Sequence, residues 1–221
     1  MNQAYENAGA GESGVCGFTI EVAGEGMTTA APDRTRITLG VVTEGKDVMT
    51  AQKENASHIE AIITALMGLG LAREAMMTKT YAVEPQYDYI DGSQTLRGYK
   101  AVHLLGITLD NVTDAGAVID TAAAHGANHI TDIVFLSSES AAYEAAALQE
   151  AVRSAQEKAA AIAGALGVSL SAIPCKVQEV GQEGQPIRFK AAALSMAEAG
   201  TSIEPGQLTF RAAVRVWYVY A

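Results

Sequence analysis

Two histidines stand four residues apart, the spacing that can place two metal ligands on one face of a helix. They are His125 and His129, and Gly126 lies between them. A glycine at that place predicts the end of the preceding helix, so the two imidazoles would leave a helix end and a strand in different directions. A histidine also suits a helix C-terminus because of the helix dipole. We therefore predict no metal site, since His58 and His103 have no acidic or cysteine companion at ligand spacing.

Aromatic and cationic side chains gather between residues 81 and 103. We select as ligand or interface candidates Tyr87, Tyr89, Arg97, Tyr99, His103, Cys175 and Trp217. One interpretation is cross-strand packing that supports a hairpin. The other is an exposed aromatic and cationic edge, used for self-association or for a small ligand, because tyrosine and arginine are enriched among interface anchors. The same two interpretations apply to Trp217, which stands near arginines and the last tyrosines.

The chain has two cysteines, Cys16 and Cys175, in dissimilar surroundings. One disulfide can form, but two cysteines make no disulfide framework. Burial habits of cysteine favour two free thiols, one in an N-terminal arm and one in a strand. A catalytic cysteine would require a nearby histidine or a second cysteine, and neither is adjacent.

Familiar catalytic and nucleotide-binding motifs are missing from the sequence. It contains no Gly-x-Ser-x-Gly elbow and no Walker-type loop, and a hairpin instead of a helix is expected after Gly24-Glu-Gly26. No cofactor is predicted, and whether the protein is an enzyme stays open. A formal charge of −10 without a basic tract argues against nucleic-acid binding. No apolar run is long enough for a transmembrane helix.

Hydrophobic periodicity in the first half predicts strands, one helix and a hairpin. Phe18 to Gly26 and Arg34 to Glu44 alternate as strands, and we expect them to form an antiparallel pair with a turn at Pro32-Asp33. Asp47 is the expected N-cap of a helix through Leu69. Met76 to Tyr89 and Leu96 to Leu109 are expected strands of a hairpin, because Asp91-Gly92 between them is a strong hairpin signal.

The second half predicts two helices and three strands. A short helix begins after Asp110 or Asn111 and ends at Gly126, and His129 to Leu136 is the next strand. A long alanine-rich helix runs from about Ser140 to Leu166, with an expected buried stripe of Leu148, Val152, Ala155, Ala159 and Ile162. Ile173 to Val180 and Gln207 to Tyr220 are the last strands, and the latter alternates most regularly.

The expected fold is α+β, with antiparallel-rich sheets and hairpins packed against three helices, the last long and alanine-rich. Residues 1–16 are predicted to be a flexible arm. Residues 17–221 form the folded part, with the option of two subdomains at about 17–110 and 111–221.

Several short motifs in a fixed order resemble the SIMPL domain family. They are Val22-Ala-Gly-Glu-Gly26 with Ala31-Pro32-Asp33, Leu39 to Gly45 with Ala51 to Ala56, Pro85 to Tyr89 before Gly98-Tyr99, Gly116 to Asp120 with Gly126-Ala-Asn128, the alanine-rich helix, and Ile203-Glu-Pro-Gly206. The resemblance covers about residues 17 to 220. It implies a bacterial protein of the envelope type with a stress-related role, no agreed catalytic residues, and in some members large channel-like homo-oligomers.

Two functional hypotheses follow. The first is a non-enzymatic protein that assembles with itself into a homo-oligomer of ring or channel type. The alternative is a small-molecule-binding module or an unrecognised enzyme, with a pocket between the central hairpin and the long helix and with Tyr87, Arg97, His103 and Cys175 as its first residues to mutate. The N-terminus lacks the basic and apolar regions of a secretory signal. We expect a periplasmic or secreted location if a signal was removed and a cytoplasmic one if the chain is complete.

Overall fold

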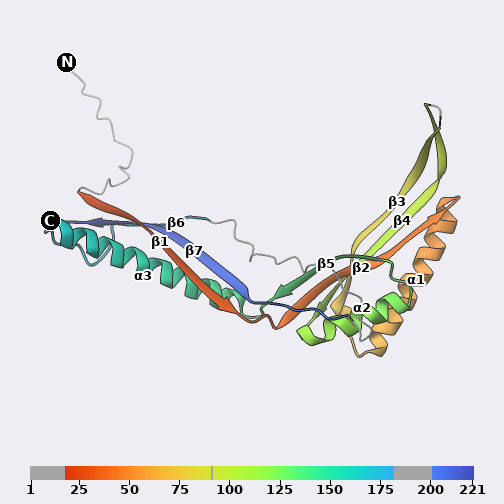
Figure 1. Cartoon of the computed structure of the whole chain (residues 1–221), viewed down its shortest axis with the longest axis horizontal. Helices are drawn as coiled ribbons and strands as arrows, with labels where there is room; N and C mark the ends of the chain where they lie inside the picture. Colours follow the sequence, from red (N-terminus) through yellow and green to blue (C-terminus); the bar gives the residue numbers. More distant parts are fainter. Residues whose placement is uncertain (1–17, 91, 182–200) are drawn as a thin grey trace, which may run out of the picture. The chain divides into compact units, whose positions relative to one another are not determined.

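The computed structural model describes residues 18–90, 92–181 and 201–221. The strands are β1 Thr19–Ala30, β2 Arg34–Gly45, β3 Met76–Ile90, β4 Ser93–Leu109, β5 His129–Leu136, β6 Lys176–Glu179 and β7 Leu208–Val219. The helices are α1 Val48–Gly68, α2 Ala115–Ala124 and α3 Ser140–Leu166, with short 3-10 turns at Arg73–Ala75 and Val112–Asp114. The predicted α+β class is confirmed, including the long last helix (Figure 1).

The chain divides into two compact units. Among the described residues, unit 1 contains 18–29, 141–181 and 209–221, and unit 2 contains 30–140 and 201–208. Unit 1 therefore takes strands from both ends of the sequence, because β7 is the neighbour of β1 in one sheet. Such units do not coincide with the consecutive stretches 17–110 and 111–221.

Unit 2 is a four-stranded sheet with two helices on one face. The strand order is β3-β4-β2-β5, and every neighbouring pair is antiparallel. The alternate residues Ile37, Leu39 and Val41 of β2 are fully or almost fully buried, and they form one core with Ile62 and Leu66 of α1. Large aliphatic side chains fill the space between this sheet and its helices.

Helix α1 begins where the sequence predicts. The Asp47 carboxylate accepts hydrogen bonds from the Thr50 amide at 2.9 Å and from the Thr50 hydroxyl at 2.7 Å, which is the N-cap interaction. At the other end Gly70 has a φ of 93°, a conformation that glycine adopts without strain. The predicted hairpin of β3 and β4 is confirmed as well, with Ile90 opposite Ser93 and a φ of 79° at Gly92, while Asp91 lies outside the described residues.

Unit 1 is a three-stranded sheet covered by α3. The strand order is β1-β7-β6, and the long alternation predicted at the end of the chain forms β7 in the middle of the sheet. The buried row of α3 consists of alanines spaced four apart: Ala147, Ala151, Ala155, Ala159 and Ala163. A Cβ atom added to Gly24 would lie 1.9 Å from the Ala151 carbonyl oxygen, and one on Gly26 would lie 2.0 Å from that of Ala147. The strand and the helix are therefore in main-chain contact.

One prediction about packing was wrong, and another was confirmed only in part. The first two strands are not a hairpin, because β1 belongs to the three-stranded sheet and β2 to the four-stranded one. Residues 31–33 between the two strands form no turn, and a proline disfavours helical backbone at the residue before it. The expected stripe of α3 is confirmed in part: Ala155 and Ala159 are buried and Leu148 packs against the core. Val152 and Ile162 are instead 37% and 41% exposed, because only alanine fits against the glycines of β1.

The strand expected at Ile173 to Val180 is shorter than predicted. It forms only over Lys176–Glu179, after a local turn in which the Ser171 hydroxyl hydrogen-bonds to the main chain of Ile173. Pro174 then supplies no amide hydrogen for a ladder.

Candidate functional site

The β3–β4 hairpin continues past the rest of its sheet. The last residue of β2, Gly45, lies opposite Tyr99 of β4, and beyond that point β3 and β4 pair only with each other. Figure 1 shows this two-stranded arm extending away from β2 and α1. Two-stranded hairpins are marginally stable in water, so an arm of this length is expected to gain stability from a covering partner.

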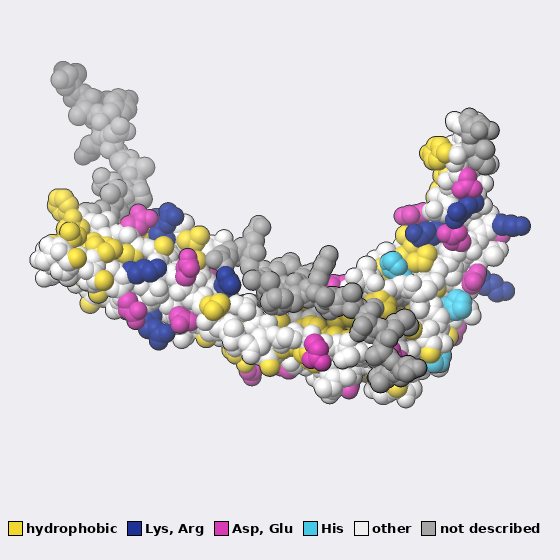
Figure 2. Space-filling model, in the orientation of Figure 1, with side chains coloured by type: hydrophobic (Ala, Val, Ile, Leu, Met, Phe, Trp, Pro, Cys, Tyr) yellow, Lys and Arg dark blue, Asp and Glu magenta, His cyan; other side chains and the backbone are white. Residues whose placement is uncertain are grey.

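One face of the arm carries large apolar side chains near its tip. Tyr87 lies directly opposite Leu96, and Tyr89, two residues further, shares their face. Their exposed fractions are 46% for Tyr87, 75% for Tyr89 and 47% for Leu96. Figure 2 shows hydrophobic surface near the tip of the arm and charged side chains along its stem. We call Tyr87, Tyr89 and Leu96 the arm patch.

The stem of the arm is tied to β2 by an ion pair. Arg97 donates to the Glu44 carboxylate at 2.5 Å, and both side chains are about half exposed. Gly98 allows a close approach there, because a Cβ atom on it would lie 2.5 Å from the Gly45 carbonyl oxygen. Tyr99 is half-buried beside this contact. Arg97 therefore ties the stem to β2, whereas Tyr87 and Tyr89 lie on the exposed surface of the arm.

His103 lies lower on the same hairpin, in a small polar cluster beside α1. Its ring meets the Tyr81 ring edge to face, with centroids 5.2 Å apart, and its Nε2 atom lies 3.1 Å from the Thr78 hydroxyl. The Tyr81 hydroxyl accepts a hydrogen bond from the Gln52 amide of α1 at 2.9 Å. Partial burial lowers the pKa of His103, because desolvation disfavours the charged imidazolium. This arrangement suits a neutral, packed histidine.

Trp217 and Cys175 lie in unit 1, so the structure does not bring them together with the hairpin residues in one unit. The Lys176 ammonium stands 4.6 Å from the centre of the Trp217 ring, a cation–π contact. The Cys175 amide donates to the Trp217 carbonyl at 2.8 Å. Cys175 is disulfide-bonded, so the favoured prediction of a free thiol was wrong for this residue. Cys16, the other predicted free thiol, and the predicted arm 1–16 lie outside the described residues.

The two spaced histidines occupy the places that the sequence predicts. His125 is the C-cap residue of α2, and its Nδ1 atom lies 2.8 Å from the Thr121 carbonyl oxygen, while His129 begins β5. No group of three or more histidine, cysteine, aspartate or glutamate side chains suited to a metal ion occurs in the part of the chain that the structure describes. No described helix is long and apolar enough to cross a membrane.

Three aspartates act as hydrogen-bond acceptors for neighbouring segments, and all three lie in unit 2. Asp33 accepts from the hydroxyl and amide of Ser138, Asp47 from those of Thr50, and Asp120 from those of Thr201. These hydrogen bonds favour the carboxylate form and lower the pKa of each aspartate. The pairs hold the start of β2, the start of α1 and the segment before β7.

Sequence reasoning missed Asn55, which is buried in α1. Its amide nitrogen donates to the carbonyl oxygens of Val41 and Ala101, at 3.0 and 3.2 Å, and so links the helix to β2 and β4. An asparagine within an apolar helical stripe is the signal that marks it, because a polar residue at a core position requires a partner.

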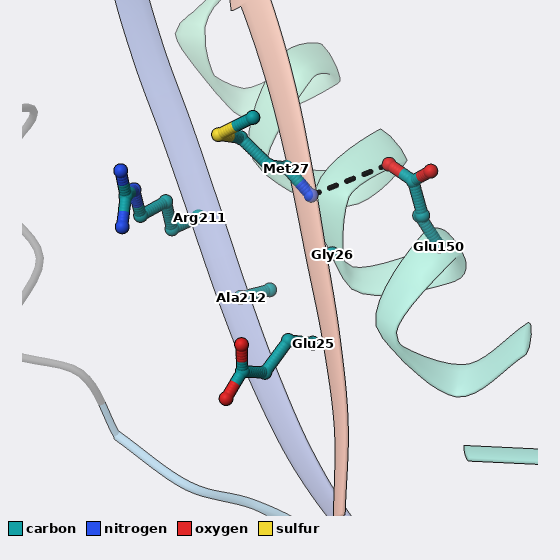
Figure 3. A pocket seen from close by; sticks show the side chains of 6 residues that line it. All are labelled: Glu25, Gly26, Met27, Glu150, Arg211 and Ala212. Atoms are coloured by element: carbon teal, nitrogen blue, oxygen red, sulfur yellow. Dashed lines mark hydrogen bonds between the residues drawn. The ribbon is translucent and has the colours of Figure 1, made fainter. Parts of the chain in front are cut away.

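A second feature that the sequence did not reveal is a shallow hollow in unit 1. It has a volume of about 560 Å³ and is lined by Glu25, Gly26, Met27, Glu150, Arg211 and Ala212. Figure 3 shows Glu150 on α3 reaching toward the Met27 amide, while Arg211 and Glu25 extend from the sheet on the side away from α3. None of the candidate residues selected from the sequence lines it.

Comparisons with known proteins identify the same family as the resemblance seen in the sequence. The model of the family described as "SIMPL: Protein of unknown function (DUF541)" matches residues 20–218. The "26 kDa periplasmic immunogenic protein" of Brucella melitensis is 24% identical over 207 residues, which are 89% of this chain and 82% of that protein. The "Uncharacterized protein YggE" of Escherichia coli is 28% identical over 144 residues, 63% of this chain and 58% of that protein. Since the family model spans nearly all of both units, the chain belongs to the SIMPL family.

Proposed function

We propose that this protein is a non-enzymatic SIMPL protein that assembles with itself into a homo-oligomer of ring or channel type. The observation that carries the proposal is the arm patch. It places three large side chains on one face of an arm that has no cover among the described residues. Exposed aromatic residues on a strand pair are the kind of anchor that protein interfaces use.

The stem supports the same function. The Arg97–Glu44 ion pair and the tight passage at Gly98 fix the direction in which the arm leaves the sheet. A preoriented arm loses less conformational entropy when it docks than a loop would. The arm would therefore seat the same surface on every neighbouring copy, as a closed symmetric assembly requires.

Mass photometry of the purified full chain tests the proposal. We expect a discrete oligomer for the wild type, and smaller species for the variant Tyr87→Ser/Tyr89→Ser/Leu96→Thr at the same concentration. Phe18→Ser is the matched control, because Phe18 is 80% exposed but lies in unit 1. A wild type that is monomeric at tens of micromolar, or an arm-patch variant with an unchanged oligomer, would refute it.

We also propose a periplasmic or secreted location. Cys175 is disulfide-bonded, disulfides persist in oxidising compartments, and the Brucella relative is described as periplasmic. Cys16 is the only other cysteine in the sequence, so we expect an intramolecular bond between the two. Peptide mapping without reductant should find this cross-link in protein recovered from cells with thiols blocked; two alkylated thiols would contradict the location.

The alternative of a small-molecule pocket between hairpin and long helix stays a prediction, as does the stress-related role. The hairpin residues Tyr87, Arg97 and His103 lie in unit 2, and most of the long helix lies in unit 1.

A further inference from the structure

The edge of β1 carries main-chain groups that have no strand beside them. β7 is the neighbour of β1 on one side, and no described strand pairs with the other side. The Phe18 carbonyl accepts from the Tyr220 amide of the β7 end, so the main-chain groups of even-numbered residues face β7. Those of Ala23, Glu25 and Met27 then face outward, because successive residues of an antiparallel strand alternate between the two sides.

Two side chains of α3 form hydrogen bonds with outward-facing main-chain groups of this edge. The Glu150 carboxylate accepts a hydrogen bond from the Met27 amide at 3.3 Å, and the Lys158 ammonium donates one to the Ala23 carbonyl at 2.8 Å (Figure 3 shows the first). A carboxylate stands in for the carbonyl of a neighbouring strand and an ammonium for its amide. Both contacts are exposed, so an incoming main chain can replace them at little cost.

Among the described residues, the space along this edge is open. A hollow of about 400 Å³ lies beside the edge and is lined by Glu25, Glu150, Arg153, Ser154 and Glu157. It shares Glu25 and Glu150 with the hollow at Gly26 and Met27. The hollow lined by Glu25 and α3 lies at the unpaired edge, whereas the other also reaches Arg211 and Ala212 of β7.

The charges along the edge favour a cationic partner. Arg153 is paired with Glu150 at 3.5 Å, and Lys158 is bound to Ala23. Glu25 and Glu157 form no ion pair among the described residues. A side chain on an added strand directly opposite Glu25 would stand about 5 Å from it, close enough for a cross-strand ion pair.

We propose that the β1 edge from Ala23 to Met27 is a docking site for an extended peptide segment that bears lysine or arginine at alternate positions. The segment adds to the sheet as a fourth strand and displaces Glu150 and Lys158 from the main chain of β1. Main-chain pairing supplies the affinity, and Glu25 with Glu157 supplies the preference for positive charge. The site is independent of the arm patch, which lies in unit 2.

Fluorescence anisotropy with a labelled heptapeptide of alternating lysine and valine tests the site on the full wild-type chain. We expect saturable binding that weakens as salt increases. The same peptide with N-methyl groups on alternate amides, in each of the two registers, should bind at least about tenfold more weakly, which corresponds to about 1.4 kcal/mol. A glutamate–valine peptide should not bind. N-methylation changes only the probe, so a folding defect cannot mimic the result.

Protein variants then locate the binding on the molecule. Glu25→Gln/Glu157→Gln should weaken binding several-fold, and Lys158→Met should strengthen it, because it removes a cation and a competitor for the Ala23 carbonyl. Glu60→Gln, an exposed carboxylate on α1 of unit 2, is the matched control. The proposal would be overturned if the N-methylated peptides bound as tightly as the unmodified one, or if these variants left binding unchanged. It would also be overturned if sedimentation velocity showed that a second copy of the chain, and not the peptide, occupies this edge.

Discussion

The two units cover a sheet with helix in opposite ways. In unit 2 large aliphatic side chains such as Ile37, Ile62 and Leu66 fill a wide layer between sheet and helices. In unit 1 the glycines of β1 and the alanines of α3 bring the two backbones into contact. The packing of unit 2 depends on large side chains that fill the layer, and the packing of unit 1 depends on positions with no side chain or only a methyl group. Unit 2 should therefore be sensitive to truncation, and unit 1 to any added atom.

The largest effect is expected from truncation in unit 2. Leu66→Ala removes a fully buried side chain from the core of α1 and should lower the free energy of unfolding by about 3–4 kcal/mol. Urea unfolding followed by circular dichroism measures it. Leu166→Ala is the matched control, since Leu166 of α3 is 62% exposed, and it should cost less than about 1 kcal/mol. Equal effects at the two leucines would break the comparison.

Adding one methyl group to unit 1 should have the next largest effect. Gly24→Ala would place a Cβ atom 1.9 Å from a helix carbonyl oxygen, so α3 must move, at a cost of about 2–3 kcal/mol. Trp217 is the one tryptophan of the chain and lies in unit 1, so its fluorescence follows the unfolding of that unit. Gly164→Ala on α3 meets no atom within 4 Å and should instead stabilise the helix by about 0.5–1 kcal/mol. If both substitutions were neutral, the close contact would be absent.

A buried polar residue adds a third difference between the units. The buried polar side chains among the described residues are Thr35, Thr43 and Asn55, all in unit 2. Asn55→Ala removes two hydrogen bonds to strand carbonyls and should cost about 1–2 kcal/mol, as measured by urea unfolding. Ser57→Ala, an exposed position on the same helix, should change stability by less than about 0.5 kcal/mol. A similar cost at both positions would assign the loss to the helix backbone instead.

Acid should destabilise unit 2 before unit 1. The pKa values of Asp33, Asp47 and Asp120 are lowered in the fold by hydrogen bonds, so the folded state binds fewer protons than the unfolded chain. The stabilisation is complete above their ordinary pKa of 3.8 and is lost as the pH falls through the lower folded values. The lowered pKa of His103 acts with the same sign, starting below 6.5.

Hydrogen exchange measured by mass spectrometry from pH 7 downward, corrected for the intrinsic exchange rate, separates the units. Protection should fall first in β2, α1 and α2, and later in α3 and β7. The variant Asp33→Asn/Asp120→Asn should show a smaller pH dependence than the wild type in unit 2 only. Protection that falls in unit 1 first would contradict the assignment of the acid-sensitive contacts.

Much of the fold could be predicted because the signals are local. Asp47 caps α1 through its own neighbour Thr50, β3 and β4 form the predicted hairpin, and α3 and β5 have the predicted bounds. Of the candidate residues, Tyr87 and Tyr89 are exposed on an arm as one interpretation required. Three features were not predicted, because each depends on partners that are remote in sequence. They are the buried Asn55, the disulfide state of Cys175, and the edge of β1 that hydrogen-bonds to side chains of α3.

Periodicity by itself determined which segments are helices and strands, because the repeat of apolar residues sets which conformation can bury them. Periodicity could not determine which strands pair with one another or which face of a helix packs against a sheet. Alternation in β1 and β2 is equally compatible with one hairpin or two sheets, and only the pairing of β1 with β7 decided for two. Likewise the helical period of α3 allowed a stripe that includes Val152 and Ile162 beside Ala155 and Ala159. The glycines of β1 selected a row of alanines alone, because nothing larger fits against their backbone.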